Sequence, residues 1–356
     1  MRSTAFIGFF TLVLAVPAAA QNLPVIDDLV APYIGSDTPG MTVLVTGQGA
    51  VQHMAGYGHA DLDTKAPMTP DSVFDLASVS KQFTGTAAKL LIEDDLFNRA
   101  TEISEFLPDF AHYGAGQRPV VVGDLIYHLS GLPDYLDETL FDYQADTSNA
   151  QIIAWLAQAG PAHPPGTRFD YSNSGYVTLG SLVAAAAEME TLEAVLHDRV
   201  WSPLGMAKTR LGAPVDPTAA VTGYAGSDGD FEPSQFMTVA EGDGSVYTSI
   251  ADLARYEKAL ATGSLLGTAA TAELFVDGQL DDGTAIGVLE EEGYGFGWSV
   301  MSGQGDAIAY HSGSWMGTAT VYLRNLDTGT SVVILANGED FDPVDLAFEI
   351  AEAVDG

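Results

Sequence analysis

Cysteine is absent from the 356-residue sequence, and basic residues are scarce. Without cysteine the chain can form neither a disulfide, a thiolate metal site nor a cysteine-linked lipid anchor. Only 13 Lys and Arg residues stand against 48 Asp and Glu, which gives a formal net charge of −35. So acidic a chain is repelled by nucleic acids and by anionic membrane surfaces, and nucleic-acid binding is therefore not expected.

Long apolar runs are also scarce. Residues 1–20, MRSTAFIGFFTLVLAVPAAA, carry one arginine, an apolar stretch and a run of alanines that ends at Ala20. This layout is typical of a cleavable secretory signal, and we predict cleavage after Ala20. The apolar stretch is shorter than the roughly 20 residues that a membrane-spanning helix needs, and no later stretch approaches that length. We therefore expect residues 21–356 to be exported to a bacterial periplasm or the medium, without stable membrane insertion.

Strand patterns occur near both ends of the chain. Residues 41–58 indicate a hairpin around a glycine turn at 47–49. Beyond Gly242, four further strand-like runs are separated by Gly, Asp and Asn turns: GYGFGWSVM, AIAYHSG, TATVYLRN and TSVVILAN. Strands at both ends of a chain indicate an antiparallel sheet that is assembled from its two termini.

Helix patterns lie between and after these strands. A buried helix is predicted to end at about Glu93, and a long apolar run over 175–204 is also helical in pattern. Ser249 and Asp252 form a plausible capping pair for a later helix, and a last helix covers 344–353. We predict an α+β fold in one domain, residues 21–356, whose antiparallel sheet is flanked by helices. Its α/β part covers about 21–93 and 240–356, and an inserted, mainly helical part covers about 94–239.

One of the few lysines follows a serine by three residues in FDLASVSKQFTGTAAKLL. On a helix this spacing puts Ser78 and Lys81 on one face. Ser78 would lie at the helix start, where backbone N–H groups favour an oxyanion, and a shielded amine can take the proton of a hydroxyl. A Ser/Lys pair at this spacing often lies on a solvated helix face and has no catalytic role. The residues around this pair are apolar, which favours the catalytic interpretation.

A second candidate segment contains Tyr171 and Asn173, in a turn before a long apolar helix. The phenol can relay a proton with Lys81, and the amide can bind a substrate carbonyl or orient the lysine. Alternatively, Asn173 caps the following helix and Tyr171 packs against it.

A third segment, AYHSGSWMGTATVYL, contains His311 among strand-like residues. Gly313 lacks a side chain, so a substrate backbone can approach the strand edge closely. The backbone N–H of Ser314 can act as an oxyanion donor beside that of Ser78. His311 either binds a polar group of the substrate or is a structural residue.

Taken in this order, Ser-x-x-Lys, Tyr-x-Asn and His-x-Gly resemble the motifs of the serine β-lactamase and D-alanyl-D-alanine carboxypeptidase superfamily, which includes penicillin-binding proteins. The class C-like branch is the most similar, and HLSGLPDY, HPPGTRFDYSNSGY and GDGSVYTSIADLARY also look like stretches of that family. The resemblance implies that Ser78 is the acylated nucleophile, Lys81 its general base and Tyr171 a proton-transfer residue. It further implies a set of substrate-binding residues, namely Asn173, His311, Gly313 and Ser314.

The resemblance implies an exported serine hydrolase acting on amide or ester bonds. A D-alanyl-D-alanine carboxypeptidase or related D-peptidase is favoured, with a small-molecule or peptidoglycan-derived peptide substrate. A class C-like β-lactamase or an esterase is the alternative, and a penicillin-binding or peptide-sensing module is the non-enzymatic one. Histidine rather than lysine at 311 weakens the positive charge that holds a substrate carboxylate. Arg324 and Arg168 are candidate substitutes for that charge.

Signatures of other enzyme classes are absent from the sequence. There is no G-x-S-x-G, no H-E-x-x-H, no Walker-type phosphate loop and no complete G-x-G-x-x-G. The other histidines show no spacing typical of metal ligands and are interpreted as structural or surface residues: 53, 59, 112, 128, 163 and 197. Neither a metal nor a cofactor is expected, and the oligomeric state is left open.

Overall fold

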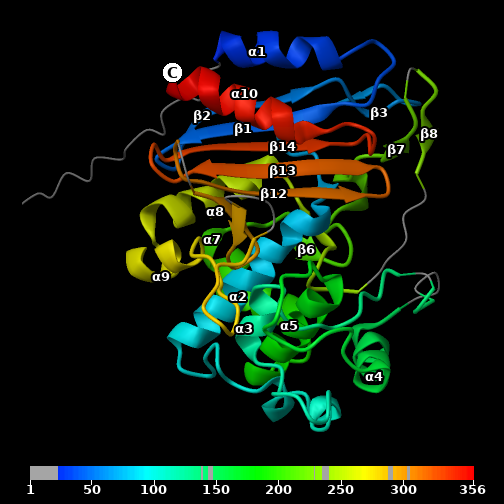
Figure 1. Ribbon diagram of the computed structural model, residues 1–356. Helices are drawn as coiled ribbons and strands as arrows, with labels where there is room; N and C mark the ends of the chain where they lie inside the picture. The colour runs from blue at the N-terminus through cyan, green and yellow to red at the C-terminus, as the bar shows by residue number, and fades with distance from the viewer. Residues whose placement is uncertain are drawn as a thin grey trace, which may run out of the picture.

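The computed structural model describes residues 23–137, 139–142, 147–227, 229–234, 240–287, 292–302 and 305–356. The predicted signal segment, residues 1–20, lies outside the described residues. A large sheet with helices on both of its faces forms one part of the molecule, and a mainly helical part lies beneath it in Figure 1.

The main sheet has seven antiparallel strands in the order β10-β11-β12-β13-β14-β1-β2. Its strands come from both chain ends: β1 Met41–Gly47, β2 Ala50–Tyr57, β10 Glu292–Tyr294, β11 Ser299–Met301, β12 Ile308–Trp315, β13 Thr318–Asn325 and β14 Thr330–Ala336. The predicted α+β fold with an antiparallel sheet built from both ends is therefore confirmed.

The predicted strand GYGFGWSVM is wrong in one respect. It forms two short strands, β10 and β11, which pair with each other. Gly297, with φ +82°, makes the turn between them, and the Gly295 N–H donates to the Trp298 carbonyl across it at 2.7 Å. A left-handed residue is easily supplied by glycine, so the aromatic-rich run reverses direction here.

Two helices from opposite chain ends, α1 Pro24–Val30 and α10 Pro343–Asp355, cover one face of the sheet (Figure 1). Strands β13 and β14 are buried along their whole length, as expected of strands with covered faces. The apolar layer between these helices and the sheet contains Ile26, Val30, Val43, Val45, Val321, Leu323, Val332, Ile334, Leu346 and Ile350.

The remaining helices are α2 Lys81–Glu93, α3 Val122–Ile126, α4 Asn149–Ala159, α5 Asn173–Ala186, α6 Leu192–Leu196, α7 Ser202–Leu204, α8 Ile250–Thr262 and α9 Thr268–Glu273. The capping prediction for α8 is confirmed, because the Asp252 N–H donates to the Ser249 hydroxyl. The single helical run predicted over 175–204 is wrong. It breaks after α5, where Glu188 has φ +53°, and resumes at α6 with Thr191 as its N-cap.

The other strands are short and form three small sheets: β3 His59–Asp61, β4 Ala66–Pro67, β5 Phe74–Asp75, β6 Arg210–Leu211, β7 Tyr224–Ala225, β8 Glu232–Pro233 and β9 Val246–Thr248. A small sheet in the order β5-β9-β6 pairs Asp75 with Tyr247. This pairing brings the turn before α2 next to residues 240–248, although the two segments are far apart in the sequence. The division into an α/β part and an inserted helical part, with boundaries at about residues 93 and 240, stays a prediction.

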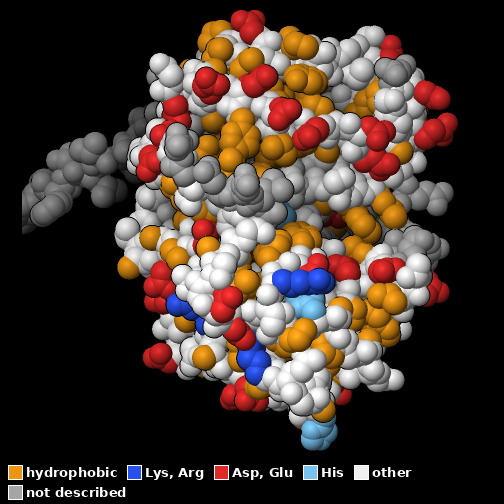
Figure 2. Space-filling model, in the orientation of Figure 1, with side chains coloured by type: hydrophobic (Ala, Val, Ile, Leu, Met, Phe, Trp, Pro, Cys, Tyr) orange, Lys and Arg blue, Asp and Glu red, His pale blue; other side chains and the backbone are white. Residues whose placement is uncertain are grey.

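Acidic side chains are spread over the face of the molecule shown in Figure 2, and Lys and Arg side chains are few there. Carboxylates that are spread over a surface favour solubility. The acidity therefore marks the whole surface in this view rather than one patch.

Candidate active site

Ser78 lies in a tight turn that links β5 to α2. The turn, Ala77–Ser80, is a 3₁₀ segment that continues directly into the helix. Ala77 has φ +48°, and the Asp75 carboxylate accepts a hydrogen bond from its N–H at 2.9 Å. A left-handed backbone at alanine is strained and persists only where its surroundings fix it. The turn therefore presents Ser78 in a fixed position at the start of a helix.

The Lys81 side chain is fully buried against Ser78. Its ammonium donates three hydrogen bonds, to Ser78 Oγ at 3.1 Å, to Asn173 Oδ1 at 2.9 Å and to the Asp243 backbone carbonyl at 2.8 Å. An ammonium has three donors, so these bonds occupy all of them. All three acceptors are neutral oxygens, and the amine is held directly against the serine hydroxyl.

Tyr171 contacts Lys81 through its ring. The Lys81 Nζ lies 4.9 Å from the ring centroid, and the ring also packs against His128 with centroids 4.4 Å apart. Within the described part of the chain, the Tyr171 hydroxyl makes no hydrogen bond to Ser78 or Lys81. The expected Lys81–Tyr171 link is thus a cation–π contact in this structure.

Asn173 is the first residue of α5, and its amide is fixed at both ends. Asp134 Oδ2 accepts hydrogen bonds from the Asn173 backbone N–H at 2.9 Å and from its Nδ2 at 3.2 Å. The amide oxygen is thereby turned toward Lys81. The cap of α5 is Ser172, whose hydroxyl accepts from the Gly175 N–H. The alternative in which Asn173 itself caps the helix is therefore wrong.

His311 lies on β12 and is buried in an aromatic cluster. Its Nε2 is 3.0 Å from the Tyr294 hydroxyl, and its Nδ1 is 2.6 Å from the Ser312 carbonyl. Burial, with a smaller effect of the nearby Lys81 ammonium, lowers the pKa of His311 to about 3. His311 is therefore neutral at physiological pH and supplies no fixed positive charge.

Gly313 and Ser314 follow on the same strand. Ser314 is exposed and lines a cleft with Ser78. Gly313 faces the turn below: a Cβ there would lie 2.4 Å from the Leu76 carbonyl oxygen and 2.5 Å from Thr320 Oγ1. The sequence suggested that glycine admits a substrate backbone. In the structure the close approach is made by the protein's own chain.

The cleft over Ser78 has a volume of about 150 Å³ and brings together the three predicted segments. Its described lining is Asp75, Ala77, Ser78, Tyr135, Leu136, Tyr171, Asn173, Asp243, Gly244, Ser245, Ser314 and Trp315. Lys81 lies beneath Ser78, and His311 lies behind Tyr171, where their ring centroids are 6.0 Å apart. The seven predicted residues therefore lie on or next to one cleft.

Sequence reasoning missed two acidic side chains in this lining. Burial raises the pKa of the Asp75 carboxyl to about 7, and the neighbouring Asp243 adds to the rise. Burial likewise raises the pKa of Asp243 to about 6, against the lowering effects of Lys81 and Tyr135. Asp243 and Tyr135 lie in GDGSVYTS and HLSGLPDY, so those family-like stretches were the available signal.

Neither of the two candidate arginines supplies the positive charge that a lysine at position 311 would bring to the cleft. Arg324 is buried and bonds to Glu257 at 2.8 and 2.9 Å, and Arg168 pairs with Asp170 at 2.8 Å on the surface. No arginine is among the described residues that line the cleft. The expectation that one of them holds a substrate carboxylate is not supported.

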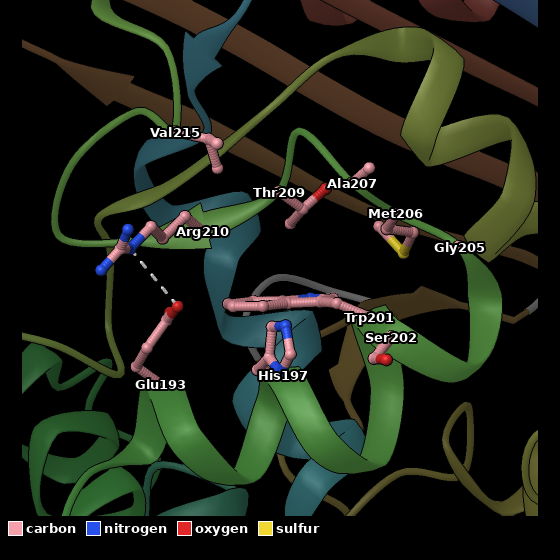
Figure 3. Close-up of a pocket in the computed structure, with 10 residues that line it drawn as sticks. All are labelled: Glu193, His197, Trp201, Ser202, Gly205, Met206, Ala207, Thr209, Arg210 and Val215. Carbon is pink, nitrogen blue, oxygen red and sulfur yellow. Dashed lines mark ion pairs between the residues drawn. The ribbon is translucent and has the colours of Figure 1, made fainter.

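A larger hollow of about 580 Å³ lies beside α6 and α7 (Figure 3). In its lining Glu193 and Arg210 lie 3.6 Å apart, and the Thr209 hydroxyl contacts Asp252 and Thr248, which lie outside the lining. No lysine is among the described residues of this lining, so no lysine amine is held against a hydroxyl there. The arrangement suited to nucleophilic chemistry is in the smaller cleft.

In the described ranges, no group of three or more His, Asp or Glu side chains is placed to hold a metal ion. None of the described helices is long and apolar enough to span a membrane.

Solved structures with the same fold are known. The penicillin-binding protein from Bacillus halodurans superposes with a TM-score of 0.77 at 22% identity, over 92% of this chain and 99% of that one. At that identity the likeness concerns the fold. The chain has the fold of β-lactamases and penicillin-binding proteins.

Residues 26–355 match the family model Beta-lactamase, and the chain belongs to this family of serine hydrolases. "Penicillin-binding protein 4*" of Bacillus subtilis (strain 168) is 28% identical over 319 residues, which are 84% of this chain and 68% of that protein. A D-aminopeptidase of Brucella anthropi is 28% identical over 321 residues, 85% of this chain and 56% of that protein. The chain thus spans little more than half of the latter.

Proposed function

We propose that this protein is an exported D-peptidase that cleaves amide or ester bonds through an acyl-enzyme on Ser78. One observation above all supports the proposal: Ser78 Oγ lies 3.1 Å from the Nζ of a fully buried Lys81, on the wall of a cleft. A serine hydroxyl needs a neighbouring base to become a nucleophile, and an amine at hydrogen-bond distance can act as that base.

The reaction proceeds in two steps. The first step begins once Lys81 has released its ammonium proton to solvent: the free amine takes the proton of Ser78 as Oγ bonds to the donor carbonyl carbon, and the N–H groups of Ser78 and Ser314 stabilise the oxyanion. The leaving group departs with a proton, which Tyr171 can deliver from the Lys81 side. Water then attacks the acyl-enzyme ester, and Lys81 passes a proton from the water to Ser78 Oγ. The acid product leaves, and Ser78 is restored.

The charges of the cleft bear on the choice of donor. A carboxypeptidase must recognise a terminal carboxylate, but His311 is neutral and Arg324 and Arg168 are paired elsewhere. These features favour a D-peptidase acting on D-amino-acid amides over a D-alanyl-D-alanine carboxypeptidase. An esterase of the same mechanism is the second candidate, because an ester donor needs no charged terminus to be recognised.

The test is Ser78→Ala, assayed beside wild type on a p-nitrophenyl ester, a D-amino-acid amide and a fluorescent penicillin. Loss of the nucleophile should lower turnover of every donor by more than about 1000-fold. Ser104→Ala, outside the cleft, is the control and should keep wild-type rates. Mass spectrometry after mixing should place an acyl adduct on Ser78.

The donors also separate the alternatives. Stable penicillin labelling without turnover indicates a penicillin-binding or sensing module, rapid loss of penicillin indicates a β-lactamase, and ester turnover alone indicates an esterase. A Ser78→Ala enzyme that keeps more than about a thousandth of the wild-type rate would disprove the assignment of the nucleophile.

A further inference from the structure

Asp243 presents an unused hydrogen-bond acceptor at the cleft. The residue lines the cleft beside Ser78 and is only 5% exposed. Its Oδ2 accepts a hydrogen bond from the Tyr135 hydroxyl at 2.9 Å, whereas Oδ1 is buried and has no partner among the described residues. A buried acceptor without a donor is costly, so such an atom at a candidate site calls for a ligand group that donates to it.

The second carboxyl of the lining is already engaged. Asp75 accepts hydrogen bonds from the Ala77 N–H at 2.9 Å, from the Ser245 N–H and from the Tyr247 hydroxyl. It fixes the turn that carries Ser78, and its carboxyl lies in the same lining as that of Asp243. Asp243 is therefore the lining carboxyl that has an oxygen left for a ligand.

The charges around this oxygen are unbalanced. Asp134 is a third nearby acid that raises the pKa of Asp243, and the Lys81 side chain lowers that pKa. No Lys or Arg is among the described residues of the lining. Three carboxyls thus act on this site against one lysine amine, and charges interact strongly in a shielded site. An anionic ligand would increase this imbalance, and a cationic ligand would reduce it.

We propose that Asp243 binds a primary ammonium group of the acyl donor, so that the enzyme selects donors with a free amine over neutral or anionic ones. The inference rests on the proposed function, because it names the donor class of the Ser78 cleft. The donated N–H completes the coordination of Oδ1, and the positive charge offsets the surplus of carboxyls. Asp243 is thereby the residue that determines specificity.

Binding to Ser78→Ala tests this without turnover. Calorimetry would give dissociation constants for D-alaninamide, N-acetyl-D-alaninamide and N-succinyl-D-alaninamide, which differ in N-terminal charge. At about pH 7 an α-amino group, with an ordinary pKa of about 7.7 to 8.0, is mostly protonated. We expect the free amine to bind at least about tenfold more tightly than the acetyl compound, and the succinyl compound to bind most weakly.

The Ser78→Ala/Asp243→Asn variant removes the charge but keeps an oxygen for Tyr135. It should reduce the amine-to-acetyl ratio to below about threefold, while affinity for the acetyl compound stays within about threefold. The matched control is Asp277→Asn in the same background. Asp277 has a buried Oδ1 without a partner too, among the described residues, but it lies outside the cleft lining. This control should keep the full ratio.

Three results would overturn the inference: equal affinities for the amine and acetyl compounds, an unchanged ratio in Asp243→Asn, or no measurable binding of the amine. The proposed function fails separately, if wild type turns over none of the donors or if Ser78→Ala keeps its activity. The amine preference is read from binding alone, so the two failures are distinguishable.

Discussion

Helix α2 carries two buried lysines whose surroundings differ sharply. Lys89, two turns after Lys81, is 2% exposed, and its ammonium lies 2.7 Å from both Glu93 and Glu273. Burial lowers the pKa of Lys89, but these two carboxylates outweigh it and leave the pKa raised. The far end of the helix thus follows the ordinary rule that a buried charge is paired.

The cleft end breaks that rule. Lys81 is as deeply buried, but its hydrogen bonds go to a hydroxyl, an amide oxygen and a backbone carbonyl. The nearby Asp243 offers Lys81 its backbone carbonyl, while its carboxylate bonds to Tyr135. A carboxylate on Lys81 would stabilise the ammonium and oppose its use as a base. The difference agrees with the proposed roles, in which Lys89 stabilises the fold and Lys81 acts as the base.

Exchanging each lysine for methionine gives the largest expected contrast. Lys81→Met should lower kcat/KM for an ester donor by about 1000-fold or more, because it removes the base beside Ser78. Its free energy of unfolding should stay level or rise, since the buried amine has no carboxylate partner that the substitution would leave behind. Lys89→Met is the control and should keep activity within about threefold. Steady-state assays and urea unfolding measure both, and a Lys81→Met enzyme with a tenth of wild-type activity would contradict the base assignment.

Removing the two carboxylates that pair with Lys89 tests the far end of helix α2. Glu93→Gln with Glu273→Gln leaves Lys89 buried without an anionic partner. Both glutamates are about half exposed, so we expect a loss of about 2 kcal/mol in the free energy of unfolding, less than for a fully buried pair. Activity of the folded enzyme should not change. Urea unfolding that shows no loss would mean that the two ends of the helix do not differ as described.

The sequence was sufficient to predict those parts of the fold and the site that depend on local sequence patterns. The strand patterns at 41–58 and 318–336 are long and apolar, so they predicted the sheet. Ser78 and Lys81 are three residues apart on a continuous helical segment, so helical geometry alone brought them together. Tyr171 and Asn173 were found because they lie at the start of the long helix α5.

Other features depend on contacts between distant segments. The sheet pairing of β5 with β9 places Asp243 beside Ser78, across more than 160 positions of sequence, and no local pattern encodes it. The approach of Leu76 to Gly313 is likewise tertiary. The neutral state of His311 follows from its burial, which a strand pattern with one polar residue does not predict.

The smallest expected effect concerns the pH dependence of stability. The pKa of a carboxyl at the cleft end of helix α2 and that of a carboxyl at its far end shift in opposite directions. Burial raises the pKa of Asp243 from 3.8 to about 6, despite Lys81 and Tyr135. The hydrogen bond from Lys89 lowers the pKa of Glu273 below 4.5. Between pH 3.8 and about 6, folded Asp243 holds a proton that the unfolded chain has lost. Its contribution to stability therefore falls as pH rises through this window.

Glu273 has the opposite sign, since its stabilising contribution is complete above the unfolded pKa and is lost as pH falls through the folded one. Asp243→Asn should thus flatten the decline of unfolding free energy from about pH 4 to 6 and raise stability at pH 8 by about 1 kcal/mol. Glu273→Gln should instead remove the gain in stability seen as pH rises through the acidic range. Urea unfolding of both variants across pH 3 to 8 measures these slopes. Parallel curves for wild type and Asp243→Asn would mean that the cleft carboxyl is no more costly to ionise than a surface one, and the distinction between the two ends would rest on the lysines alone.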